Sequence, residues 1–211
     1  MWNDLSQQWR TVLEEAWTAF SNNCVPIGAA IFDKSGRLIV KDHNRSGYQT
    51  TLNPMTAHAE SNTLNRLDCR NGLQVRDVVM YSSMEPCPMC MGAIVMSNIK
   101  DLHFGSHDRW CGAVHLLDED PYFRSQHISV KEPHEEIEFF QLVLSSYHEL
   151  KHANIGGNSA VIDCFRISSR AAVEAAERLY VRRTLDNLAM QEKNCAEIYD
   201  MIIQLKEEQN V

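Results

Sequence analysis

Hydrophobic residues recur at steps of three and four near the beginning of the chain. Over residues 2–20 this apolar series is made of Leu5, Trp9, Val12, Ala16 and Phe20. Such spacing places one apolar stripe along an α-helix. The polar residues 21–23 that follow are typical of a helix end. We therefore predict an amphipathic helix over residues 2–20.

Short apolar runs with turn residues between them follow this helix. Residues 27–33 and 37–41 are largely apolar, and the turn segment 34–36 (Lys-Ser-Gly) separates them. This arrangement predicts a β-hairpin. The polar segment 42–54 contains several turn formers and predicts a loop.

Helices and strands alternate beyond the loop. We predict a helix over residues 56–67, a buried strand over 77–83, a helix that Pro86 opens, and a short strand at 102–104. This alternation predicts an α/β sandwich whose strands pair at least partly in parallel.

The rest of the chain has a mainly helical pattern. We predict a strand at 128–130, a helix over 134–152, a linker at 154–158, and helix from about Ser169 to the end with a break near Asn194.

These patterns divide the chain into a domain at residues 1–153 and a helical extension at 154–211. We expect the extension to pack on the domain or on a dimer partner, because roughly 55 residues barely form a core alone.

The composition is that of a globular protein. Of the 211 residues, 44% are hydrophobic and 23% are charged, which argues against disorder. The apolar runs are shorter than the ~18 residues that a membrane helix needs. The first residues lack the basic start and apolar stretch of a secretory signal. We expect a cytoplasmic protein without membrane segments.

The formal net charge of -8 is spread evenly, since residues 1–120 and residues 121–211 each carry -4. Tight binding to a phosphate backbone needs clustered Lys and Arg. The charge balance therefore favours a small substrate over a nucleic acid.

Two of the seven cysteines stand apart from the others. An odd number of cysteines, with no export signal, argues against a disulfide framework. Cys87 and Cys90 stand at positions i and i+3, so that on a helix both thiolates face one side. With His58 as a third ligand they suit Zn²⁺. Three ligands leave one position for water, as in a catalytic zinc site.

Glu60 lies two residues after His58, at the start of the same predicted helix. It is placed to move a proton without binding the metal. A zinc-bound water has its pKa lowered from ~15.7 to about 7, which makes hydroxide available at neutral pH. The alternatives are a structural zinc site closed by another cysteine and, for Glu60, a solvated carboxylate.

The combined pattern is His-Ala-Glu at 58–60 and Pro-Cys-Pro-Met-Cys at 86–90, the signature of zinc deaminases that act on bases. Over roughly residues 5–120 the sequence resembles the cytidine/deoxycytidylate deaminase-like superfamily, nearest the branch of tRNA adenosine deaminases and guanine deaminases. The resemblance also includes Val-Pro-Ile-Gly-Ala-Ala from residue 25 and Phe-Gly-Ser-His-Asp from residue 104.

This resemblance implies a three-layer α/β/α sandwich with a central mixed five-stranded sheet. It implies zinc held by His58, Cys87 and Cys90, and a zinc-bound hydroxide that attacks a ring carbon bearing an amino group. Glu60 would be the proton shuttle, and the products would be the oxo base and ammonia. A homodimer is also implied.

Four residues are expected to contact the substrate. The resemblance gives Asn44 a base-contacting role and places Asp108 near a bound nucleotide. Ala57, directly before the histidine ligand, and Trp110, which could stack on a base, complete the set. The alternatives are a local turn for Asn44, a helix cap or turn for Asp108, and packing in a partly covered core for Trp110.

Three functions follow from these observations. The first is a zinc-dependent hydrolytic deaminase of a free nucleobase or nucleoside. The second is a tRNA adenosine deaminase, which needs a basic surface beside the pocket; Arg45, Arg109 and Arg124 are the candidates for it. The third is a non-catalytic binding module stabilised by zinc with four protein ligands.

Overall fold

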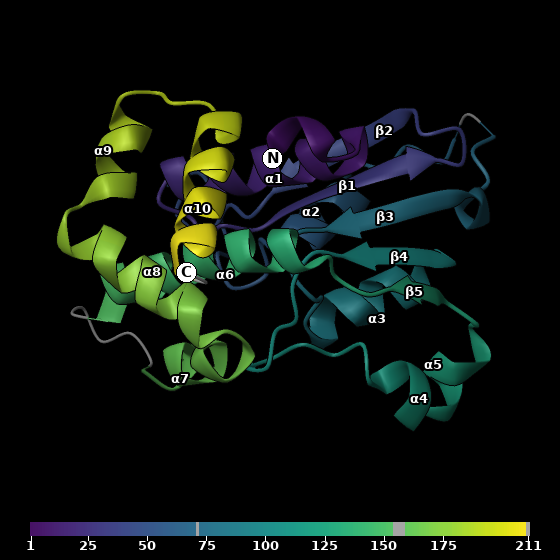
Figure 1. Cartoon of the computed structure of the whole chain (residues 1–211). Coiled ribbons are helices and arrows are strands. Elements are labelled where there is room, and N and C mark those ends of the chain that lie inside the picture. The colour runs from purple at the N-terminus through teal and green to yellow at the C-terminus, as the bar shows by residue number, and fades with distance from the viewer. Residues whose placement is uncertain (71, 154–158, 210–211) are drawn as a thin grey trace.

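The computed structural model describes residues 1–70, 72–153 and 159–209. Within these residues, five strands form one mixed sheet between layers of helices (Figure 1). The strands lie in the order β2 (Leu38–His43), β1 (Gly28–Asp33), β3 (Val78–Ser82), β4 (Asp101–Phe104) and β5 (Ser129–Lys131). β1 is antiparallel to β2 and β3, whereas β3, β4 and β5 are parallel. The predicted sandwich, its hairpin and its partly parallel pairing are confirmed.

Alternate residues of β1 face different helical layers, because successive side chains of a strand point to opposite faces. Phe32 packs in a small core with Val12 of α1 (Gln7–Ser21). Ile31 packs instead in the core that includes residues of α2 (Ala59–Asn65) and α3 (Pro88–Met96). The zinc motifs therefore lie in the layer on the other side of the sheet from α1.

The close approach of α1 to the sheet depends on a glycine. A Cβ at Gly28 would lie 2.3 Å from the carbonyl oxygen of Val12 and 2.6 Å from the backbone nitrogen of Ala16. The helix begins after Ser6, whose side chain accepts a hydrogen bond from the backbone N–H of Trp9. A 3-10 turn at Trp2–Asp4 precedes it.

The C-terminal helices share a core with the N-terminal helix. They are α6 (Glu135–Ala153), α7 (Ser159–Ser168), α8 (Arg170–Val181), α9 (Thr184–Met190) and α10 (Cys195–Gln209). Tyr147 and Tyr199 are fully buried in one cluster with Leu13 and Trp17 of α1. The two ends of the chain thus meet in one core (Figure 1).

The pattern predicts helix from about Ser169 to the end with one break near Asn194, but the helix is also interrupted at Arg183. This residue has a left-handed backbone (φ 53°) between α8 and α9. The predicted break near Asn194 is confirmed, because α9 and α10 lie on either side of it. The pattern did not predict α7, and the predicted linker 154–158 lies outside the described residues.

The proline that opens α3 is Pro88, so the prediction of Pro86 was wrong by two residues. Cys87 is the N-cap residue, and Pro88 occupies the first turn, where its missing N–H costs nothing. Short helices not predicted from the sequence are α4 (Leu116–Glu119), α5 (Pro121–Ser125) and a 3-10 turn at Val75–Asp77. Among the described residues, no helix is long and apolar enough to cross a membrane.

Candidate active site

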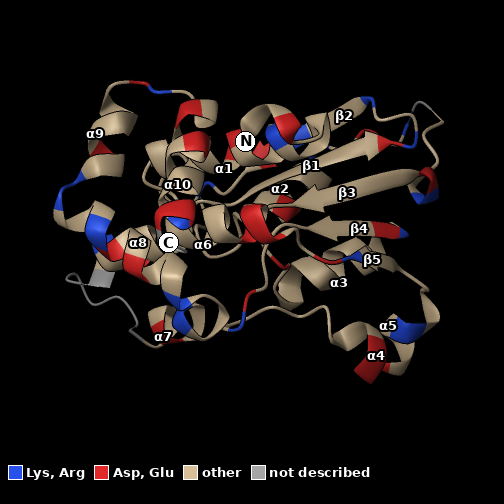
Figure 2. Cartoon of the chain, in the orientation of Figure 1, with Lys and Arg blue, Asp and Glu red and all other residues tan. Residues whose placement is uncertain are grey.

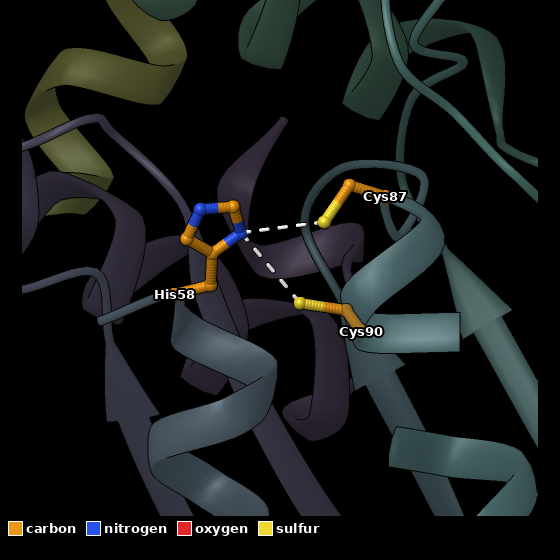
Figure 3. Close-up of side chains that lie close together, drawn as sticks. All are labelled: His58, Cys87 and Cys90. Atoms are coloured by element: carbon orange, nitrogen blue, oxygen red, sulfur yellow. Dashed lines mark hydrogen bonds between the residues drawn. The ribbon is translucent and has the colours of Figure 1, made fainter. Parts of the chain in front are cut away.

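The side chains of the two sequence motifs converge where α2 and α3 begin. His58 is the N-cap residue of α2, and Cys87 is the N-cap residue of α3. Glu60 and Cys90 follow in the first turns. His58 Nδ1 lies 3.5 Å from Cys87 Sγ and 3.6 Å from Cys90 Sγ (Figure 3). The predicted ligands are therefore brought together by two helix starts.

The arrangement of these three atoms fits a zinc ion. In the part of the chain that the structure describes, His58, Cys87 and Cys90 are the one group whose donor atoms all lie within 4.8 Å of one another. Bonds of ~2.0–2.3 Å in a tetrahedron place neighbouring ligand atoms roughly 3.3–3.8 Å apart, in agreement with the two measured distances. One nitrogen and two sulfur donors suit Zn²⁺. This group of described residues contains no fourth protein ligand, unlike a closed structural site.

The thiols and the imidazole are electrostatically coupled. The Cys90 side chain, with a further contribution from His58, lowers the pKa of Cys87 to about 4. The hydrogen bond with Cys87 raises the pKa of His58. The interaction with Cys87, together with burial, raises the pKa of Cys90. The Cys87 thiol therefore loses its proton easily, whereas the Cys90 thiol keeps its proton. A divalent cation bound to these sulfurs would favour the loss of both protons.

Glu60 is buried beside the metal ligands. The Ser82 hydroxyl donates a hydrogen bond of 2.8 Å to its Oε1, and Cys90 Sγ lies 3.4 Å from its Oε2. Burial raises the pKa of Glu60, although the hydrogen bond from Ser82 and the charge of His58 act in the opposite direction. A carboxyl group with a raised pKa is suited to accept and return a proton near neutral pH.

A cavity of about 200 Å³ adjoins the metal site. Its lining comes from the loops around the motif and from α6 and α7, and consists of Val25, Pro26, Ile27, Asn44, His58, Met84, Asp108, Trp110, Cys111, Ser145, His148, Glu149, Val161 and Phe165. The predicted substrate contacts Asn44, Asp108 and Trp110 thus share this cavity with His58. Ala57 is not among the described residues that line it; its carbonyl group accepts hydrogen bonds from the Arg45 backbone and the Asn62 side chain.

Two of the cavity residues also make the local hydrogen bonds that the sequence allows as alternatives. Asn44 Oδ1 accepts a hydrogen bond of 2.9 Å from the backbone N–H of Ser46. Asp108 Oδ1 accepts one of 2.9 Å from the backbone N–H of Trp110. Each residue therefore shapes its own loop and lines the cavity, and the substrate-binding roles stay predictions.

Glu85 supports this site, although it is not among the site residues predicted from the sequence. Its carboxylate accepts hydrogen bonds from the backbone N–H groups of Asp108 at 3.2 Å and Val114 at 3.1 Å. It thereby ties the loop carrying Asp108 and Trp110 to the segment before α3. The signal in the sequence that could have indicated this role is the presence of an acidic residue inside an otherwise apolar zinc motif.

The cavity residues of α6 and α7 were also missed. They are Ser145, His148 and Glu149 on α6 and Val161 and Phe165 on α7. They belong to ordinary amphipathic helices, and no motif marks them. Only the folding of these helices over the metal site identifies them.

Comparison with known proteins agrees with this geometry. Residues 3–106 match the family described as the cytidine and deoxycytidylate deaminase zinc-binding region. A tRNA-specific adenosine deaminase of Rickettsia bellii (strain RML369-C) is 37% identical over 108 residues, which make up 50% of this chain and 72% of that protein. A guanine deaminase of Bacillus subtilis (strain 168) is 32% identical over 126 residues, which make up 58% of this chain and 74% of that protein.

A solved structure also resembles the chain. It comes from a study of A-to-I editing by tRNA:A34 deaminases at the wobble position of transfer RNA. Its sequence identity is 30% and its TM-score 0.51, and the match covers 60% of this chain and 91% of that chain. With the His58–Cys87–Cys90 zinc site and Glu60 beside it, these similarities mean that the chain belongs to the cytidine and deoxycytidylate deaminase zinc-binding family and is a zinc-dependent deaminase.

Proposed function

We propose that this enzyme hydrolytically deaminates an amino-bearing nucleobase or nucleoside that is free in solution. The observation that carries this proposal is the size and the lining of the cavity beside His58. The cavity measures about 200 Å³, and residues of α6 and α7 contribute to its lining. Pockets for drug-sized ligands typically measure ~300–1,000 Å³, so this one suits a smaller molecule.

The charges around the cavity support an uncharged substrate. Asp108 and Glu149 contribute carboxylates to the lining, and no Lys or Arg is among the described lining residues. Across the described chain, basic residues are interspersed with acidic ones (Figure 2). A surface that binds a phosphate backbone would instead gather basic side chains around the opening.

The second candidate function is deamination of adenosine in tRNA, which the names of several relatives favour. Two of its candidate arginines are engaged within the chain. Arg45 forms an ion pair of 2.8 Å with the buried Asp42, and Arg124 donates a hydrogen bond to the carbonyl group of Asp118. Arg109, next to the cavity residue Asp108, is the arginine best placed to meet a nucleotide.

The residues of the site have separate roles in the proposed reaction. His58, Cys87 and Cys90 would hold zinc, which supplies an activated water when it is bound. Glu60 would accept a proton and deliver it to the departing amino group. The ring carbon thereby exchanges its amino group for an oxygen from water, and ammonia leaves.

The test is to replace Glu60 by Gln in the zinc-loaded protein and to measure ammonia release. We expect turnover to fall by about 10²–10⁴-fold, because that is the range of general acid–base catalysis. Zinc content, measured by elemental analysis, should stay at the wild-type level. Glu15→Gln is the matched control, because Glu15 is also largely buried but pairs with His43 away from the metal. Wild-type turnover by Glu60→Gln would contradict the proposal.

A further inference from the structure

One wall of the cavity beside the zinc site comes from helices outside the part of the chain that matches the family. The family match ends at residue 106, whereas α6 and α7 begin at Glu135 and Ser159. Both helices nevertheless contribute to the same cavity as His58. The C-terminal part of this chain therefore builds a portion of its active-site pocket.

On α6, the wall presents polar groups that are fixed in place. Ser145 Oγ accepts a hydrogen bond of 3.0 Å from Gln141 Nε2, which also donates one of 2.7 Å to the carbonyl group of Pro26. The Ser145 hydroxyl can still donate its own hydrogen to a ligand in the cavity. His148 lies one turn further along, so the two residues share a helix face.

His148 adds a neutral imidazole to this face. It is buried, and burial lowers its pKa to about 3, with His152 and Lys151 acting in the same direction. A neutral imidazole offers one hydrogen-bond donor and one acceptor. This combination can pair with the edge of a heterocycle that carries ring nitrogens and exocyclic groups.

On α7, the wall is apolar. Val161 and Phe165 stand at positions i and i+4, which lie on one face of a helix. Phe165 is almost fully buried, and Val161 is half-buried. A flat ring system gains both contact area and aromatic stacking from such a surface.

We propose that α6 and α7 form the base-recognition wall of this deaminase and restrict it to free nucleobases. In this proposal Ser145 and His148 hydrogen-bond to the ring edge, while Val161 and Phe165 contact the ring face. A cavity of about 200 Å³ suits a base better than the larger ribonucleoside, and the carboxylates of Asp108 and Glu149 disfavour phosphate. The inference rests on the proposed function and specifies its substrate class.

The first experiment changes the size of the wall. Val161→Phe fills the cavity from α7, whereas Ile167→Phe places the same side chain at an exposed position of the same helix. With each purine and pyrimidine base and its ribonucleoside as probes, we expect Val161→Phe to lower kcat/KM for the base at least ten-fold. Ile167→Phe should match the wild type. Val161→Ala should narrow the preference for base over ribonucleoside, a shift that a purely structural role would not produce.

The second experiment removes the polar groups of the wall. His148→Leu and Ser145→Ala should each raise KM about ten-fold, the effect of losing one hydrogen bond to the substrate. The fall in kcat should be smaller, and zinc content should not change. His148→Gln, which keeps a donor and an acceptor, should retain most of the affinity.

A binding measurement separates this inference from the proposed reaction. Calorimetric titration of zinc-loaded Glu60→Gln with the same bases needs no turnover. If a base binds to Glu60→Gln and adding Val161→Phe abolishes that binding, the base-recognition role of α6 and α7 is supported. This holds even if no ammonia is released and the proposed reaction fails. Turnover of a base with equal kcat/KM in Val161→Phe and Ile167→Phe would refute the base-recognition role of α6 and α7. It would leave the proposed function intact. Activity or binding restricted to tRNA would overturn both.

Discussion

At the scale of single residues, the chemistry depends on a neighbour that lies outside the motif. Ser82, the last residue of β3, donates a hydrogen bond of 2.8 Å to Glu60 Oε1. The bond stabilises the charged carboxylate and so opposes the effect of burial on the pKa of Glu60. The pKa of this proposed catalytic group is therefore raised by burial and lowered by the hydrogen bonds from its own backbone N–H and from Ser82, together with the charge of His58.

We predict that Ser82→Ala raises the pKa of Glu60 further, because a donor to its charged form is lost. The acidic limb of the kcat/KM profile should move to higher pH. At a fixed pH on that acidic limb, activity should fall about ten-fold, since a hydrogen bond to a charged group is worth roughly 1.5–3 kcal/mol. Ser83→Ala is the control, because the Ser83 hydroxyl accepts from the backbone of Gly28 instead. An unchanged acidic limb in Ser82→Ala would refute this assignment.

His148 makes a second residue-scale prediction, on stability. Its pKa is lowered to about 3 in the folded protein, chiefly by burial, against a usual value near 6.5. Below pH 6.5 the His148 side chain therefore binds a proton in the unfolded chain but not in the folded chain. Acid for this reason favours unfolding. Between pH 7 and pH 5 this residue alone should lower the free energy of unfolding by about 2 kcal/mol.

Chemical denaturation at the two pH values, with His148→Gln in parallel, measures this contribution. The loss of stability on going to pH 5 should be about 2 kcal/mol smaller in His148→Gln than in the wild type. Equal losses in both proteins would mean that His148 takes up a proton in the folded state.

At the scale of elements, the site is made by two helix starts on one layer of the sheet. His58 and Cys87 are both N-cap residues with extended backbones, at the beginnings of α2 and α3. Such positions favour anionic ligands such as thiolates, because the unpaired N–H groups of the first turn point toward them. A zinc ion would link the two helices.

We therefore predict that removing zinc lowers the melting temperature. A metal present at 1,000 times its dissociation constant stabilises the folded state by roughly 4 kcal/mol, which corresponds to about 10 °C for a chain of this size. Thermal unfolding with and without a chelator measures the shift. Cys87→Ala should show no shift, whereas Cys69→Ala, which removes an exposed thiol, should respond as the wild type does. A chelator-independent melting temperature in the wild type would contradict the zinc site.

Periodicity was a good guide to those elements whose burial pattern is regular. The helix predicted over residues 2–20 corresponds to α1 except at its start, where Trp2–Asp4 form a separate 3-10 turn, and the predicted strand at 77–83 corresponds to β3. It failed at Pro86, because two prolines flank Cys87 and either could occupy a first helical turn. It also missed the break at Arg183, because the helical pattern continues through a residue whose backbone turns left-handed.

At the scale of the whole molecule, the pocket joins regions far apart in the sequence. The metal ligands were predictable because their spacing encodes their chemistry. The wall at Ser145, His148, Val161 and Phe165 was not, because nothing local in α6 or α7 says which surface they meet. The division at residue 153 and the homodimer stay predictions.

The shared core makes a prediction about that division. Tyr147 of α6 and Trp17 of α1 pack in one cluster with Val173 of α8 and Tyr199 of α10. A chain ending at residue 153 would expose this surface, so we expect it to aggregate or to unfold without a cooperative transition. Calorimetry against the full chain tests this. A truncated chain that unfolds cooperatively would show that residues 1–153 are an independent domain.

A direct comparison of free bases with tRNA as substrates of the zinc-loaded wild-type enzyme tests the proposed function. Ammonia release is followed for each amino-bearing base, and inosine formation is followed in an unmodified tRNA transcript at matched concentration. We expect turnover of at least one free base and none of the transcript. Inosine in the transcript, with every free base left unchanged, would contradict the proposed function.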